Sequence, residues 1–433
     1  MKSPLYVVGG CALTINARMD VISDVVIEIQ DQNITDVFSQ KNFKPPANAK
    51  VVDTSDCLVM PGLVNTHNHI AMSLLRGAAD DLPLKNWLME VIFPIERKWG
   101  SPEFVYAGSR LSLAELIRTG TTCIQDMYYF EEWAAKAIHE AGVRAVCGQD
   151  FNEISGVQTH KERFGTFDSF LEKVTSYPLI TPAMAPHSVY GLKPERWKDV
   201  VAYAKQRNLR VHMHLAETQK EEDDFLKQNG QSPTQFLEKV GLLDLPVCFA
   251  HATCVTQTDI AILGKHRVGI AHNPESNLKL GTRIAPVVEL RNAGCPVGLG
   301  TDGCASNNNL DLLQEADTAA KLQSFSRGVG VLRAEDVVRM LTIDGAKALG
   351  LDDRIGSLEK GKAADLIAID LNKPHATPLY NPYSHIVYSA CGQDVKHSVV
   401  NGQVLMENTQ LLTLDEQAIL NEAKRWAEKI SQM

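Results

Sequence analysis

The spacing of hydrophobic positions changes near residue 59. Before that point, short apolar runs alternate with turn-rich stretches, which predicts a small β layer. After it, strand-like apolar runs alternate with longer stretches of helical periodicity, the pattern of βα units around a parallel sheet. The strands predicted in the first part are residues 5–8, 12–15, 25–29 and 51–52.

The second part contains eight strand-like runs. Eight strands, each followed by a helix, are what a (β/α)8 TIM-like barrel requires, and the span fits the size of about 250 residues that is typical of this fold. We therefore predict an α/β protein built on such a barrel. The eight runs are residues 59–66, 121–127, 144–149, 180–187, 209–215, 247–251, 268–272 and 296–301.

Two later runs, residues 363–370 and 395–405, again have the pattern of strands. We expect them to join the N-terminal β layer, so that both chain ends build one small, discontinuous β-sandwich. The predicted domains are residues 1–58 for the first part of this sandwich, 59–355 for the barrel, and 356–433 for the second part of the sandwich with a terminal helix.

Two helix starts carry sequence signals. Ser101, followed by a proline, predicts the cap of a helix over residues 104–118. The final helix is predicted over residues 414–433, with Thr413 and Glu416 in the spacing of a capping box. Its apolar stripe predicts that it packs on the body of the protein.

The amino-acid composition and net charge indicate which kinds of molecule the protein can bind. Hydrophobic residues make up 44% and charged residues 22%, as in an ordinary globular protein. The net charge is −9 and no run of basic residues occurs, which argues against nucleic acid and anionic membranes as partners. The nine cysteines form no Cys-x-x-Cys pair, and no secretory signal or long apolar run is present. These features predict a reduced, cytoplasmic protein that acts on a small molecule.

Histidines and one aspartate mark the carboxyl ends of the predicted barrel strands. These ends share one face of a TIM barrel, the face that carries the active site. A single histidine at a strand end is usually a structural residue, but repetition at several strands indicates a site. The residues concerned are His67, His69, His187, His214, His251, His272 and Asp302.

His67 and His69 lie on the same side of an extended strand, because strand side chains alternate. With His214 and Asp302 they offer nitrogen and oxygen ligands that suit Zn²⁺ or a similar divalent transition metal. His212 shares a strand face with His214, so spacing alone admits either of them or neither. We favour His214, because Glu217 follows it by three residues and can carry protons beside the metal; as a single residue, Glu217 could equally be a solvated acid.

Blocks of sequence spread over most of the chain carry a family resemblance: Met60-Pro-Gly-Leu-Val-Asn-Thr-His-Asn-His69, Leu74-Leu-Arg-Gly77, Phe93-Pro-Ile-Glu96, Gly120-Thr-Thr-Cys-Ile-Gln-Asp126, Ala185-Pro-His-Ser188, His214-Leu-Ala-Glu217, His272-Asn-Pro-Glu-Ser-Asn-Leu-Lys-Leu280, Gly300-Thr-Asp-Gly-Cys-Ala-Ser-Asn307 and Gly361-Lys-Ala-Ala-Asp-Leu366. With these blocks the chain resembles the amidohydrolase superfamily and, within it, the 5′-methylthioadenosine/S-adenosylhomocysteine deaminase group.

The resemblance implies an enzyme that hydrolyses the amino group of an adenine nucleoside, giving the inosine analogue and ammonia. The substrate would be 5′-methylthioadenosine, S-adenosylhomocysteine or adenosine. One Zn²⁺ per subunit, or another divalent transition metal, is implied as the cofactor. The implied metal ligands are His67, His69, His214 and Asp302.

The same resemblance implies roles around the substrate. Glu217 would act as acid and base beside the purine, and His251 would hold and polarise the nucleophilic hydroxide. Asp302 would also take the proton of that hydroxide as it attacks. Glu96 would bind the ribose hydroxyls and His187 would contact the substrate.

Related activities stay open as alternatives. A deaminase of guanine or another aminated heterocycle, or a triazine hydrolase, would use the same metal site, although Glu96 argues for a ribose. Dihydropyrimidinase-like enzymes need a bridging lysine on the fourth strand, and residues 180–187 contain none, so a single metal is expected. A scaffold that has lost catalysis would lack ligands that are all present here.

Other points are not decided by the sequence. Some relatives carry an arginine just beyond the third strand, where this chain reads Val146-Cys-Gly-Gln-Asp150, so the preferred 5′ substituent stays open. The physiological metal stays open too, and a homo-oligomer is compatible with the sequence. Trp87 is expected to pack in the core rather than to stack on the ligand.

Overall fold

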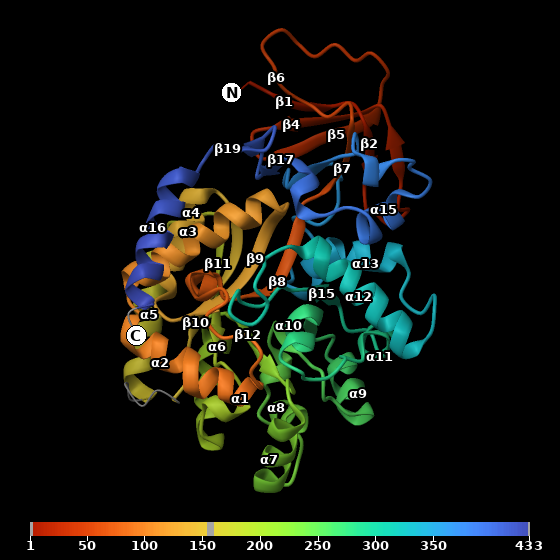
Figure 1. Ribbon diagram of the computed structural model, residues 1–433. Helices are drawn as coiled ribbons and strands as arrows, with labels where there is room; N and C mark the ends of the chain where they lie inside the picture. Colours follow the sequence, from red (N-terminus) through yellow and green to blue (C-terminus); the bar gives the residue numbers. More distant parts are fainter. Residues whose placement is uncertain (1–2, 154–159, 432–433) are drawn as a thin grey trace.

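The computed structural model describes residues 3–153 and 160–431, and it contains the predicted barrel (Figure 1). Eight parallel strands form one sheet in the order β8 to β15, and hydrogen bonds from the Thr66 hydroxyl to the Leu299 carbonyl and from the Asp302 amide to the His67 carbonyl join its two ends. The strands are β8 (Leu63–Asn68), β9 (Thr121–Tyr128), β10 (Arg144–Asp150), β11 (Ile180–Ala185), β12 (Arg210–Leu215), β13 (Val247–His251), β14 (Gly269–His272) and β15 (Val297–Leu299).

Two further sheets lie at the end of the barrel opposite α7 (Gln219–Asn229) and α8 (Pro233–Lys239) (Figure 1). The four-stranded sheet has the order β5-β4-β1-β6, and the seven-stranded sheet has the order β19-β18-β17-β16-β7-β2-β3, so strands from both chain ends are paired. Their bounds are β1 (Leu5–Val8), β2 (Cys11–Leu13), β3 (Val21–Ser23), β4 (Val25–Gln30), β5 (Asn33–Ser39), β6 (Lys50–Asp53), β7 (Cys57–Pro61), β16 (Leu366–Asp370), β17 (Val395–Val400), β18 (Gln403–Glu407) and β19 (Gln410–Leu411).

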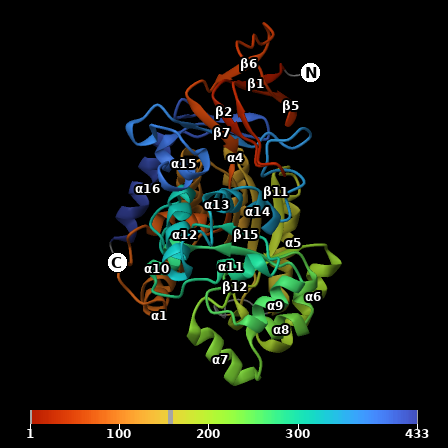
Figure 2. The same cartoon turned by 90° about the vertical axis from the view of Figure 1, so that its right-hand side faces the viewer.

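Helices surround the barrel on its outside, as two perpendicular views show (Figures 1 and 2). Among the described residues, no helix is both long enough and apolar enough to cross a bilayer. The α-helices are α1 (Leu84–Asn86), α2 (Phe93–Trp99), α3 (Pro102–Arg118), α4 (Glu131–Ala141), α5 (His160–Val174), α6 (Trp197–Gln206), α7 (Gln219–Asn229), α8 (Pro233–Lys239), α9 (Gln257–Lys265), α10 (Pro274–Lys279), α11 (Val287–Asn292), α12 (Leu312–Arg327), α13 (Ala334–Leu341), α14 (Ile343–Ala348), α15 (Pro382–Tyr388) and α16 (Glu416–Ile430).

The predicted strand over residues 59–66 was wrong as a single element. β7 belongs to the seven-stranded sheet and β8 to the barrel, and Gly62 separates them. A side chain at Gly62 would collide with Thr122 on the neighbouring barrel strand, so the chain can pass there only as glycine. An apolar run that continues through such a crossing gives no sequence sign of two strands.

The predicted strand over residues 395–405 is likewise two strands, β17 and β18, paired as a hairpin. Asn401 and Gly402 lie between them with φ of +51° and +75°, the left-handed conformations of a tight hairpin turn. The Asn-Gly pair was therefore a usable signal. β3 and β5 were not predicted at all.

The two helix ends that carried sequence signals differ in outcome. Ser101 caps α3 as predicted, accepting a hydrogen bond from the Phe104 amide at 3.2 Å. The capping box at Thr413 was wrong, because Asp415 caps α16 and the Thr413 hydroxyl donates to the Ala141 carbonyl instead. The predicted packing of this helix is confirmed: Ile419 is buried.

A buried ion pair joins the barrel to the sandwich. Asp365, just before β16, accepts hydrogen bonds from Arg144 of β10 at 2.8 and 3.1 Å, and both side chains are 2% exposed. Removing one partner of a buried pair leaves an uncompensated charge, so Asp365→Asn should lower the free energy of unfolding by about 3–5 kcal/mol. Denaturant unfolding measures this. As a control, Glu416→Gln breaks the exposed pair with Arg118 and should lower the free energy of unfolding by less than about 1 kcal/mol. Equal losses in the two variants would show that the buried pair contributes no more to stability than an exposed one.

Candidate active site

The carboxyl ends of the barrel strands surround one pocket. The predicted site residues that line it are His69, Glu96, His187, His214, Glu217, His251 and Asp302. Within this pocket, the acidic lining residues are Glu96, Asp150, Glu217 and Asp302, and no lysine or arginine is among the described residues that line it. A ligand bound in this pocket would therefore contact carboxyl and imidazole groups but no basic side chain of the described lining.

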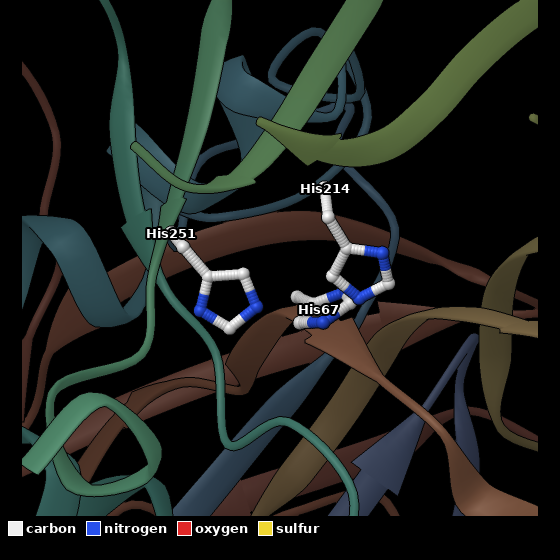
Figure 3. A group of neighbouring side chains, drawn as sticks. All are labelled: His67, His214 and His251. Carbon is white, nitrogen blue, oxygen red and sulfur yellow. The ribbon is translucent and has the colours of Figure 1, made fainter. Parts of the chain in front are cut away.

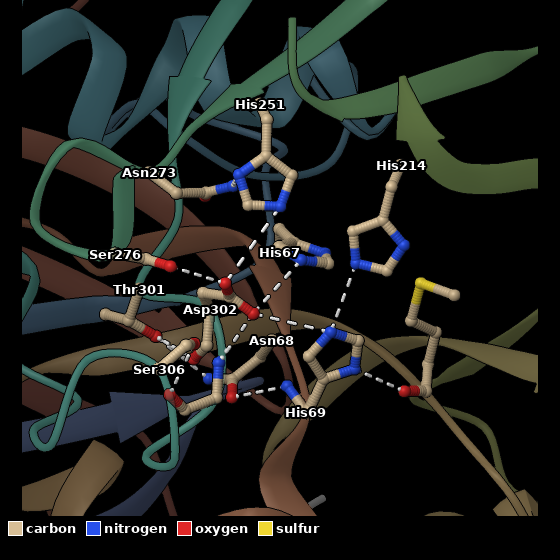
Figure 4. A network of polar contacts seen from close by, with 12 residues as sticks. His67, Asn68, His69, His214, His251, Asn273, Ser276, Thr301, Asp302 and Ser306 are labelled. Carbon is tan, nitrogen blue, oxygen red and sulfur yellow. Dashed lines mark hydrogen bonds and ion pairs between the residues drawn. The ribbon is translucent and has the colours of Figure 1, made fainter. Parts of the chain in front are cut away.

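Four side chains converge at the bottom of this pocket. His67 Nε2 lies 3.4 Å and His69 Nε2 3.3 Å from Asp302 Oδ1, and His69 Nε2 lies 3.3 Å from His214 Nε2. The potential ligand atoms of His67, His69 and Asp302 are all within 4.8 Å of one another, as are those of His67, His214 and His251. Figure 3 shows the last three rings facing one another, and Figure 4 the contacts around Asp302.

The backbone bends sharply where these side chains leave their strands. His187, Ala216, His251 and Asp302 all have a φ between +43° and +72°, which is uncommon for residues other than glycine. At Asp302 the Gly303 amide donates to Oδ1 at 2.8 Å and holds the carboxylate in place. Strained backbone of this kind is concentrated at functional sites.

Hydrogen bonds set the orientation of three imidazoles. The Nδ1 atoms of His69 and His214 lie 2.7 and 2.9 Å from the backbone carbonyl oxygens of Met127 and His187. His251 Nδ1 lies 2.9 Å from Asn277 Oδ1. Since a backbone carbonyl oxygen only accepts, Nδ1 of His69 and of His214 carries the proton, and their Nε2 atoms point lone pairs at the centre.

This arrangement fits a divalent cation. His67 Nε2 and His251 Nε2 are buried and have no hydrogen-bond partner in the described part of the chain. Burial also lowers the pKa of His67 to about 3, so that its imidazole is neutral and can ligate at neutral pH. Unpartnered nitrogen lone pairs beside a carboxylate oxygen form a donor set that suits a divalent cation.

Glu217 and His251 lie above this centre. His251 Nε2 is 3.8 Å from Glu217 Oε1 and 4.0 Å from Asp302 Oδ2. The Glu217 side chain is 12% exposed and lines the pocket, whereas Asp223 and Asp224 of the same acidic run are exposed on α7. Burial raises the pKa of Glu217, which favours a carboxyl group that holds a proton. A solvated acid would lack this environment.

Glu96 reaches the pocket from α2 rather than from a loop. Its Oε1 accepts a hydrogen bond from the Tyr128 hydroxyl. Burial, together with the nearby charge of Asp150, raises the pKa of Glu96 to about 7. His187 lines the same pocket, with its ring centroid 4.7 Å from that of His214. A carboxylate fixed at one oxygen keeps the other free for a ligand.

The positions of His272 and Trp87 differ from what the sequence indicated for a site residue and a core residue. His272 is fully buried outside the pocket, and neither ring nitrogen has a hydrogen-bond partner among the described residues. Trp87 is 6% exposed in the core, as expected, but it also lines the pocket and donates from Nε1 to the Ala305 carbonyl at 3.2 Å. It lies in the π-helical turn Trp87–Ile92 between α1 and α2.

Sequence reasoning missed several lining residues. Tyr128, Tyr129 and Asp150 follow or end β9 and β10, so they share the strand-end position that identified the histidines. Ser276, which lies outside the pocket lining but donates its hydroxyl to Asp302 Oδ2 at 2.7 Å, was missed as well. Weighing every polar residue at a strand end, and not only histidine, would have found the first three.

Comparison with known proteins gives consistent matches. The sequence model of the Amidohydrolase family matches residues 58–405. A 5-methylthioadenosine/S-adenosylhomocysteine deaminase from Thermodesulfovibrio yellowstonii is 41% identical over 426 residues, covering 96% of this chain and 97% of that protein. A 5′-deoxyadenosine deaminase from Methanosphaera stadtmanae is 38% identical over 414 residues, covering 95% and 96%.

A solved structure extends the match to the fold. The crystal structure of an adenosine deaminase from Xanthomonas campestris with bound zinc superposes with a TM-score of 0.95 at 34% identity. It covers 100% of this chain and 99% of that one. The likeness therefore includes the barrel, the sandwich and the region of the histidine cluster.

Proposed function

The chain belongs to the amidohydrolase family, and from this we propose that it is a hydrolase of cyclic amidine C–N bonds that deaminates an adenine nucleoside. The products would be the inosine analogue and ammonia, and the substrates 5′-methylthioadenosine, S-adenosylhomocysteine or adenosine. One observation carries the proposal: a cluster of metal-ligating side chains and the partly buried Glu217 and Glu96 face one pocket. The names of the relatives support the same substrate class.

We assign His67, His69, His214 and Asp302 as ligands of one Zn²⁺ per subunit. Three neutral imidazoles and one carboxylate form a donor set that suits this ion. When bound, such a cation lowers the pKa of water to about 7 and so supplies hydroxide at neutral pH. β11 offers no lysine that could bridge to a second ion.

Two carboxyl groups beside the centre carry out different proton transfers in the reaction. As the nucleophile adds to C6 of the purine, the Glu217 carboxyl gives its proton to N1. Asp302 takes the proton from the attacking oxygen and returns it to the amino group, which then leaves as ammonia. His251, whose ring contacts Asn277, orients the attacking oxygen through Nε2, which lies between 3.8 and 4.0 Å from carboxylate oxygens of Glu217 and Asp302. Proton transfer of this kind contributes typically about 10²–10⁴ to a rate.

Glu96 and His187 hold the substrate. The oxygen of Glu96 that Tyr128 leaves free can accept hydrogen bonds from ribose hydroxyls. His187, beside His214, lies where it can contact the base or the sugar. Together they fix the nucleoside so that C6 faces the centre.

Steady-state kinetics on a panel of substrates tests the proposal. The panel is adenosine, 5′-methylthioadenosine, S-adenosylhomocysteine, guanine and a triazine, with ammonia release as the common readout. We expect the highest kcat/KM on a nucleoside. A higher value on guanine or on the triazine would contradict the nucleoside assignment.

Metal content is a separate prediction. The purified protein should hold one tightly bound divalent ion per chain, and chelation should abolish turnover, because the buried ligands of one centre converge on a single point. Elemental analysis with activity before and after chelation measures both. Two ions per chain, or full turnover of metal-free protein, would refute the single centre.

A further inference from the structure

We propose that His212 is a positioning residue for the metal centre: together with the backbone carbonyl of Cys248, it sets the tautomer of His67 that can bind a cation. The inference rests on the metal centre of the proposed function and assigns a role to a histidine that is not itself a ligand there.

The geometry consists of two hydrogen bonds in series. His212 lies on β12, two residues before His214, and its side chain is fully buried inside the barrel. Its Nε2 lies 2.8 Å from His67 Nδ1, and its Nδ1 lies 2.9 Å from the carbonyl oxygen of Cys248. β12 and β13 place His212 and Cys248 directly opposite each other in register.

The direction of both hydrogen bonds follows from one fixed acceptor. A carbonyl oxygen only accepts, so Nδ1 of His212 carries the proton. A neutral imidazole has a single N–H, and therefore Nε2 of His212 accepts the bond from His67 Nδ1. His67 is then left with an unprotonated Nε2, which is the atom aimed at Asp302.

His67 differs in this respect from the two other histidines assigned as ligands. His69 and His214 each donate directly to a backbone carbonyl, which no side-chain substitution removes. His67 instead donates to another imidazole, so its tautomer depends on the side chain at residue 212.

The opposite tautomer of His67 would compete with the metal. With the proton on Nε2, His67 could donate to Asp302 Oδ1, which lies 3.4 Å away. That bond would stabilise the metal-free site and would have to break before a cation could bind. By accepting from Nδ1, His212 disfavours this state and prepares the site for the ion.

Zinc affinity of metal-free protein tests the proposal without using activity. His212→Leu removes the acceptor and should weaken Zn²⁺ binding by about 10- to 100-fold. His212→Gln can accept from His67 and donate to Cys248 through one amide, and it should retain affinity within about threefold of the parent. His397→Leu replaces a buried histidine of β17 in the sandwich and should leave affinity unchanged, which controls for a general loss of stability.

Competition with a chromophoric chelator gives the dissociation constants. Parental affinity in His212→Leu, or equal weakening in the Leu and Gln variants, would reduce His212 to a packing residue and overturn the proposal. If the parent binds no divalent ion, the metal centre and this inference fall together. If it binds zinc as expected but deaminates no nucleoside, only the substrate assignment fails.

A spectroscopic measurement on the parent protein avoids dependence on how the variants fold. Long-range ¹H–¹⁵N correlation on protein labelled at histidine reports the tautomer of each ring. Both His67 and His212 should carry the proton on Nδ1, in metal-free protein as well as with zinc. A protonated Nε2 on His67 in the metal-free protein would overturn the proposal.

Discussion

Replacing Glu217 by glutamine should lower kcat by about 10²-fold or more and leave the bound metal in place. Glutamine has nearly the same shape but cannot carry a proton. The buried carboxyl of Glu217 faces the pocket beside His251, where protonation of the purine is needed before ammonia can leave. The loss should therefore appear in kcat on every nucleoside substrate, with metal content equal to that of the parent.

A matched control lies in the same acidic run. Glu222 on α7 is also buried, with a pKa that burial raises to about 8, but it does not line the pocket. Glu222→Gln should keep kcat close to the parent value, because it perturbs a similar environment without touching the reaction. An unchanged kcat in Glu217→Gln with full metal content would remove Glu217 from the mechanism and leave it as a lining residue without a role in proton transfer.

The barrel and its site could be predicted from the sequence because two regular signals coincide. Strands buried on both faces give continuous apolar runs, and the carboxyl ends of those strands all face one side. His67, His214 and Asp302 could therefore be grouped although they are far apart in the chain. Their meeting depends on strand order and not on any detail of side-chain packing.

What failed depends on contacts between distant segments. The crossing at Gly62 is fixed by its close approach to Thr122, and the Ala141 carbonyl takes up the Thr413 hydroxyl, so that Asp415 caps α16 instead. Neither partner is visible in the local pattern. The choice of His214 over His212 also depends on distant contacts, but it was made as predicted: His214 Nε2 lies 3.3 Å from His69 Nε2, whereas His212 Nε2 lies 2.8 Å from His67 Nδ1.

Glu96→Ala should reduce kcat/KM for 5′-methylthioadenosine, adenosine and S-adenosylhomocysteine together, by about 10²-fold or more, and should leave the metal in place. A carboxylate that accepts two hydrogen bonds from ribose hydroxyls gains about 1.5–3 kcal/mol from each. Tyr128 holds one oxygen of Glu96, so the carboxylate is already oriented when the sugar arrives. Glu90→Ala, which removes an exposed acid from the same segment, should change kcat/KM little.

Deoxynucleosides separate a ribose contact from a structural role of Glu96. A 2′-deoxynucleoside lacks one of the two hydroxyls, so the parent enzyme already makes one bond fewer to it, and Glu96→Ala should cost less on this substrate than on the ribonucleoside. If Glu96 only stabilised α2 against β9, through Tyr128, the variant would lose thermal stability and would lose activity equally on both sugars. Equal losses would thus refute the ribose contact and, with it, the preference for nucleosides over free bases, while a metal-dependent deaminase with the proposed ligands His67, His69, His214 and Asp302 would still stand.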